Sequence, residues 1–194
     1  MARLKIYTFP DPVLAQRAVP VERVEARHRQ LAEDMLETMY HAPGIGLAAN
    51  QVGVLERIIV VDTEYDSIEA EDLRPGEKPP EGSEWINGSY VSGKKPIVLI
   101  NPEIILREGS SQMKEACLSV PDYSAEVKRS EKIKVSYIDL DGLSREISAE
   151  GLLSVCLQHE MDHLVGTLFI DRLSPLKQDF AKKKLIKARK RSSG

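Results

Sequence analysis

Long hydrophobic runs are missing from this 194-residue chain. No stretch approaches the roughly 18 apolar residues that a membrane-spanning helix requires, which excludes an integral membrane protein of that kind. The first residues, Met1–Tyr7, contain neither an apolar core nor a small-residue cleavage site, so we expect no secretory signal and a cytoplasmic location. Only two cysteines are present, Cys117 and Cys156, which excludes a disulfide-stabilised scaffold.

Positive charge is concentrated at the C-terminal end. Residues 176–194 contain eight Lys and Arg and one acid, so this tail carries +7 while the rest carries −10. An acidic body with a basic end suggests that the end meets a polyanion, and the alternative is a solvated charged helix. The length predicts one domain, which we divide into a catalytic body (1–175) and this basic, partly helical tail (176–194).

Helices are predicted near the two ends of the chain and strands in the middle. Apolar residues recur at helical spacing in 25–40, ended by Pro43-Gly44, and in 151–164, ended by Gly166. Strands are predicted from apolar or alternating runs at 57–62, 97–100 and 132–139, with turns at Asn101-Pro102 and Asp141-Gly142. This order favours an α+β fold with mostly antiparallel sheets.

The stretch 63–95 lacks sustained periodicity. It contains three prolines and four glycines and carries a net charge of −4. We therefore expect a surface insertion between two strands, in part disordered. It holds the only tryptophan, Trp85, which we expect to pin the loop onto the body. The alternative is that Trp85 belongs to a lid or a partner contact.

The strongest chemical signal is the motif His159-Glu160-Met161-Asp162-His163. In a helix, His159 and His163 lie one turn apart on the same face and can bind one divalent metal. Glu160 can then act as general base on a water at that metal. The face that carries the histidines is otherwise apolar, so we expect this helix at the centre of the fold. The alternative is two buried structural histidines bonded to backbone carbonyls.

A metal site needs a third protein ligand. The other histidines, His28 and His41, lie on or near the charged first helix and are expected to be solvated. Cys156 lies on the same helix as His159, where a buried structural thiol is the better interpretation. Cys117 lies in another element and can supply a thiolate, which would give a three-ligand site with an open fourth position, as catalytic sites have. The alternative for Cys117 is a small buried hydrophobe.

A third segment, Gly44–Gly53, combines small residues with one amide side chain, Gln51. Small residues let a substrate backbone approach closely, although the same pattern is typical of a tight turn before a strand.

Together these segments resemble peptide deformylase. The family signatures G-hydrophobic-G-hydrophobic-A-A-x-Q, E-G-C-L-S and Q-H-E-x-D-H stand in that order at Gly44–Gln51, Glu115–Ser119 and Gln158–His163. The resemblance extends from about Ile6 to Leu173. It implies a metal-dependent hydrolase that removes the formyl group from the N-terminal formylmethionine of nascent polypeptides and releases formate.

The resemblance also implies a role for each matching residue. Cys117, His159 and His163 match the metal ligands, and Glu160 matches the catalytic acid/base. Gln51 and the backbone N–H of Leu118 match the groups that stabilise the oxyanion. The residues that match the substrate pocket are Gly46, Leu152, Val155 and Cys156.

The cofactor implied is one divalent metal ion, natively Fe²⁺, which Zn²⁺ or Ni²⁺ can replace. The partners implied are N-formylmethionyl nascent peptides, together with a ribosome contact through the basic tail. No membrane or DNA partner is expected.

The chain departs from the family pattern in two places. Ala116 stands where the family usually has Gly, and the insertion 63–95 is longer than the usual connection. Neither touches a matched ligand, so we expect altered specificity rather than inactivity. Two alternatives stay open: a metalloprotease that shares the HExxH spacing, and a deformylase-like binding protein without turnover.

Overall fold

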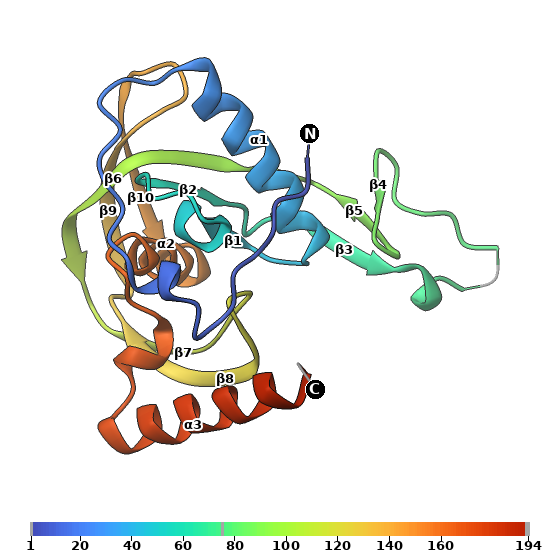
Figure 1. Ribbon diagram of the computed structural model, residues 1–194. Helices are drawn as coiled ribbons and strands as arrows, with labels where there is room; N and C mark the ends of the chain where they lie inside the picture. Colours follow the sequence, from blue (N-terminus) through green and yellow to red (C-terminus); the bar gives the residue numbers. More distant parts are fainter. Residues whose placement is uncertain (1, 75, 193–194) are drawn as a thin grey trace.

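The computed structural model describes residues 2–74 and 76–192. Within these two ranges, three α-helices and ten strands form an α+β fold in which every pairing between named strands is antiparallel, as expected (Figure 1). None of the helices in these ranges has the length and apolar character that crossing a bilayer requires. The helices are α1 (Ala26–His41), α2 (Gly151–His163) and α3 (Pro175–Ser192), with short 3-10 helices η1 (Pro12–Ala15), η2 (Ala49–Val52), η3 (Ala70–Asp72) and η4 (Phe169–Arg172).

The main sheet has five strands in the order β1-β2-β6-β9-β10. Its members are β1 (Gly46–Ala48), β2 (Ile58–Val61), β6 (Ile97–Glu108), β9 (Lys132–Ile138) and β10 (Ser144–Glu150). Strand β1 lies at one edge of this sheet and, among the strands of the described residues, pairs with β2 alone. Strands β7 (Ser111–Cys117) and β8 (Val120–Arg129) form a separate hairpin.

Helix α2 lies inside the fold because nearly all of its surface is apolar or paired. Residues 154–160, 162 and 163 are all buried. One side packs with Ile59, Leu99 and Val135 of the main sheet, through Cys156 and Leu157. This packing fixes the direction in which the HExxH side chains point.

Helix α3 lies alongside β8 and is more than a solvated appendage (Figure 1). Ala181 and Leu185 are buried in a cluster with Val127, Phe169 and Ile170. The opposite face is exposed and carries most of the basic side chains. The helix therefore combines a packed inner face with a charged outer face.

The predicted turn at Asn101-Pro102 is wrong. Strand β6 continues through both residues to Glu108. Asn101 adopts a φ of 51°, and the pairing with β9 shifts register between Ile100 and Glu103. The side-chain amide of Asn101 holds the segment in place with two hydrogen bonds to Val21, each 2.8 Å long. Its Oδ1 accepts from the Val21 N–H, and its Nδ2 donates to the Val21 carbonyl. A turn-type residue pair here marks a bulge inside one long strand.

In its described residues the insertion 63–95, called the arm below, contains strands and a short helix as well as irregular segments. It contains η3 and the strands β3 (Asp66–Glu69), β4 (Glu84–Ile86) and β5 (Ser89–Ser92), paired in the order β3-β5-β4. Figure 1 shows this small sheet extending away from the body. Ile86 and Val91 join the core cluster that contains Met39 of α1.

Two further expectations on single residues are wrong. Trp85 does not pin the arm to the body: its side chain is 58% exposed and its ring packs edge-on against Tyr90. His28 is not solvated but buried, and its Nδ1 accepts a 2.8 Å hydrogen bond from the Glu25 N–H at the start of α1. His28 therefore caps a helix, which explains its burial without any metal.

Candidate metal centre and substrate pocket

Three side chains from two elements meet in one cluster. Cys117 is the last residue of β7, and His159 and His163 lie one turn apart on α2. Their ligand atoms all lie within 4.8 Å of one another, and Cys117 Sγ is 3.3 Å from His163 Nε2. One thiolate and two imidazoles in this arrangement suit a tetrahedral divalent metal with one position left for water or substrate. The residues present therefore fit the metal that the sequence predicts.

Glu115 orients the first imidazole. Its Oε2 lies 2.8 Å from Nδ1 of His159, which leaves Nε2 directed at the cluster. Burial opposes a charge on His159, but hydrogen bonds with Cys117 and Glu115 outweigh it and hold its pKa well above the usual value. His163 has no such partner: among residues 2–74 and 76–192 its Nδ1 is unbonded, and burial lowers its pKa.

A buried ion network supports Glu115. The guanidinium of Arg129 binds both carboxylate oxygens of Glu115, at 2.6 and 2.8 Å. The same guanidinium reaches Asp162 at 2.8 Å, and Asp162 is bound in turn by two nitrogens of Arg172. Burial alone would raise the pKa of Glu115, but Arg129 and His159 lower it overall. Glu115 is therefore a charged acceptor for His159.

Sequence reasoning assigned no role to these four residues. Glu115 and Asp162 lie inside the segments discussed above. A carboxylate two residues before the candidate ligand Cys117 could have indicated a partner for a metal-binding histidine. Arg129 and Arg172 lie in unremarkable sequence, and only the folded chain brings them to the carboxylates.

Glu160 lies beside the cluster on α2 and is buried. Burial raises its pKa to about 7. Its Oε2 has no hydrogen-bond partner among the residues that the structure describes. A carboxyl group with this pKa and a free oxygen can both accept and release a proton near neutral pH.

Gln51 reaches the cluster from η2. Its Oε1 accepts a 2.8 Å hydrogen bond from Ala48 N–H, which turns the amide nitrogen towards the cluster. That nitrogen lies 3.1 Å from Ser119 Oγ and 3.6 Å from Cys117 Sγ. A fixed N–H donor is thus aimed at the space next to the thiolate.

A cavity of about 550 Å³ opens in front of this cluster. Val155 and Cys156 form its buried wall, and Leu152 stands half-exposed at its mouth. Burial raises the pKa of Cys156 well above the usual value, so it remains a neutral thiol and acts as an apolar surface. The cavity is also lined by Gly46, Gln51, Cys117, Leu118, His159 and Glu160, so it contains the predicted site residues other than His163.

The structure places the residue that departs from the family pattern and the other candidate ligands. Ala116, which stands at the usual glycine position, lines the cavity wall on β7. In the described ranges, the cluster that could hold a metal ion consists of Cys117, His159 and His163. It does not include Cys156, His28 or His41.

Comparison with known proteins identifies the family. A family model described as "Polypeptide deformylase" matches residues 3–179. The chain belongs to the peptide deformylase family. It is 47% identical over 183 residues to the peptide deformylase of Rhizobium meliloti (strain 1021), covering 94% of this chain and 91% of that protein. It is 46% identical to the peptide deformylase of Xylella fastidiosa (strain M12), with 100% of each chain covered.

The fold agrees with solved members of the family. The crystal structure of peptide deformylase from Ehrlichia chaffeensis superposes with a TM-score of 0.81 at 39% identity, covering 100% of both chains. The chain is therefore a metal-dependent hydrolase that removes the formyl group from formylmethionine at the N-terminus of nascent polypeptides, releasing formate. This sets aside the metalloprotease alternative.

Proposed function

We propose that Cys117, His159 and His163 hold the catalytic metal of this deformylase and that Glu160 is its acid/base. The observation that carries the proposal is that Cys117 and His159 cluster with His163 and also line, together with Glu160, one cavity of about 550 Å³. A bound divalent metal supplies Lewis acidity, which activates water at neutral pH and polarises a carbonyl. Iron(II) is the proposed native metal, on the family resemblance, and a thiolate with two imidazoles also accepts Zn²⁺ or Ni²⁺.

The remaining steps belong to side chains and backbone of the chain. Glu160 takes the proton of the attacking water and returns it to the leaving amine of methionine. The Gln51 amide and the Leu118 N–H donate to the formyl oxygen as negative charge develops there, and each such donor is typically worth about 3 kcal/mol of barrier. Leu152, Val155 and Cys156 hold the methionine side chain.

Formate release from a formyl-Met tripeptide tests the proposal. The protein is reconstituted anaerobically with Fe²⁺, and in parallel with Ni²⁺ and Zn²⁺, and its metal content is measured. We expect rapid release with one equivalent of metal and the fastest turnover with Fe²⁺. No release from protein that holds one metal would instead support a binding protein without turnover.

We further propose that the exposed face of α3 docks on ribosomal RNA and that the enzyme acts in the cytoplasm, where nascent chains emerge. We divide the chain into a catalytic body, residues 1–175, and a basic tail, residues 176–194, of which Ala181 and Leu185 pack on the body. Deleting α3 would uncover Phe169 and Ile170, so substitution is the better test. The variant Lys187→Gln/Lys190→Gln/Arg191→Gln changes only exposed side chains.

Co-sedimentation with ribosomes at increasing salt measures this contact. Each lost phosphate contact reduces the slope of log affinity against log salt by about 0.9. We expect the triple variant to bind ribosomes more weakly at low salt and with a shallower slope, while it turns over a short peptide normally. Equal co-sedimentation of both proteins would reject the docking proposal.

A further inference from the structure

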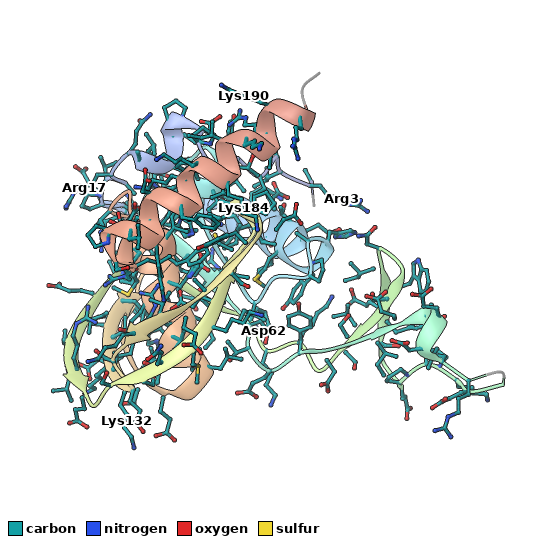
Figure 2. The ribbon with its side chains drawn as sticks, turned by 90° about the horizontal axis from the view of Figure 1, so that it is seen from below. Arg3, Arg17, Asp62, Lys132, Lys184 and Lys190 are labelled. Atoms are coloured by element: carbon teal, nitrogen blue, oxygen red, sulfur yellow. The ribbon has the colours of Figure 1, made fainter. Side chains whose placement is uncertain are left out.

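The arm is fastened to the body next to the cavity by a buried carboxylate, Asp62. Its Oδ1 accepts a hydrogen bond from Glu64 N–H, where the arm begins, and its Oδ2 accepts one from Lys95 N–H, where the arm ends. Oδ2 also accepts from the Tyr40 hydroxyl of α1 at 2.7 Å. Figure 2 shows Asp62 at the junction of arm and body. Both ends of the arm are thus bound to one point.

That point is also joined to the cavity wall. The N–H of Asp62 donates to the Ile45 carbonyl at 2.9 Å, which continues the β1–β2 ladder by one residue. Pro43, Gly44, Ile45 and Gly46 all line the cavity. We call residues 43–46 the wall segment.

Two side chains of the arm bond the backbone here, one within the wall segment and one two residues before it. The hydroxyl of Tyr65 donates to the Gly44 carbonyl at 3.1 Å, and Asn87 Nδ2 donates to the His41 carbonyl at 3.2 Å. The Tyr65 ring packs edge-on against Tyr40 with centroids 5.1 Å apart, so the hydroxyl is held at a fixed place. Burial raises the pKa of Tyr65, which keeps this donor protonated.

The wall segment has little freedom on its cavity side. A Cβ on Gly44 would lie 2.8 Å from Leu118 Cδ1, and one on Gly46 would lie 2.5 Å from Glu160 Oε1. The backbone is therefore in close contact with two elements of the candidate site on one side and bound by Tyr65 on the other. A shift of the wall segment would move the surface against which a substrate backbone lies.

We propose that Tyr65 is a positioning residue for the deformylation reaction: it holds the wall segment in place and so sets how tightly peptide substrates bind. The inference deepens the proposed function, because it rests on the wall segment being the substrate-facing surface. Tyr65 belongs to the long insertion, so the insertion contributes to substrate binding through this residue.

Tyr65→Phe tests the inference because it removes the hydroxyl and keeps the ring packing. Tyr90→Phe is the matched control: it makes the same change in the same arm, Tyr90 packs on Trp85, and the bond to the wall segment in the described residues comes from Tyr65. The substrate is a formyl-Met tripeptide. Asn87→Ala removes the second tether and serves as an independent variant.

We expect Tyr65→Phe to raise KM about five-fold, the typical effect of one neutral hydrogen bond, and to change kcat less than two-fold. A wall that binds substrate and transition state equally affects KM alone. Asn87→Ala should shift KM in the same direction, and Tyr90→Phe should leave both constants unchanged. Amide hydrogen exchange of residues 41–50 should accelerate in the first two variants only.

Two results would overturn the inference. One is a Tyr65→Phe protein whose KM and exchange rates match those of Tyr90→Phe. The other is a fall in kcat at unchanged KM, which would place Tyr65 in the chemical step. Absence of turnover in the unmodified enzyme would instead contradict the proposed function, and the exchange measurement would still test the wall segment.

Discussion

Gly46 and Glu160 are in direct contact: a Cβ built on Gly46 would lie 2.5 Å from Oε1 and 2.8 Å from Cγ of Glu160. Any side chain at position 46 must therefore displace the carboxylate. We expect Gly46→Ala to lower kcat by about 10²-fold, the lower range for loss of a general base. Overpacking should cost about 1–3 kcal/mol of unfolding free energy, which denaturant titration measures alongside formate release.

Gly44→Ala is the control for this substitution. Its Cβ would meet Cδ1 of Leu118, the end of a flexible side chain that can turn away. We expect a smaller loss of kcat than for Gly46→Ala. Equal losses in the two variants would contradict a specific contact between Gly46 and Glu160.

Glu160→Gln should separate metal binding from catalysis. Glutamine has nearly the same shape and cannot carry the proton, so kcat should fall by about 10²–10⁴-fold. Metal content should remain at one equivalent, because Glu160 is outside the Cys117, His159 and His163 cluster. The measurements are formate release and metal analysis on the same sample, and near-normal turnover with bound metal would refute the acid/base role.

Glu115→Gln should weaken both the fold and the metal site. It leaves the buried Arg129 guanidinium with an amide nitrogen facing it, and breaking a buried ion pair costs about 3–5 kcal/mol. Loss of the charged partner of His159 should weaken metal affinity by about 10–100-fold, measured by competition with a chelator. Glu126→Gln on β8, an exposed residue bonded to Gln112, should change neither quantity.

Metal removal should destabilise the protein as well as inactivate it. The ligands come from β7 and α2, so a bound ion cross-links two elements of the folded state only. At a free metal concentration 100 times Kd, the stabilisation is about 2.7 kcal/mol. Thermal unfolding before and after chelation, followed by reloading, measures this, and an unchanged Tm would argue against metal bound by this cluster.

Local patterns predicted what depends on neighbours in sequence. The helices at 25–40 and 151–164 agree with α1 and α2 to within one residue at each end. The strand predicted at 132–139 agrees with β9 to within one residue. The arm was missed because its strands are three or four residues long and lack a sustained alternation. Such strands are stabilised by pairing with each other and by packing on α1.

The sequence by itself determined the chemistry of the candidate site. Two imidazoles four residues apart on a helix must share a face, and the thiol, the carboxylate and the amide are fixed by residue type. Only the tertiary structure decided which groups meet. Glu115 reaches His159 across 44 positions and Arg129 reaches Asp162 across 33. No periodicity encodes these contacts, because they join the β7–β8 hairpin to α2, elements far apart in the sequence, at a place buried from water.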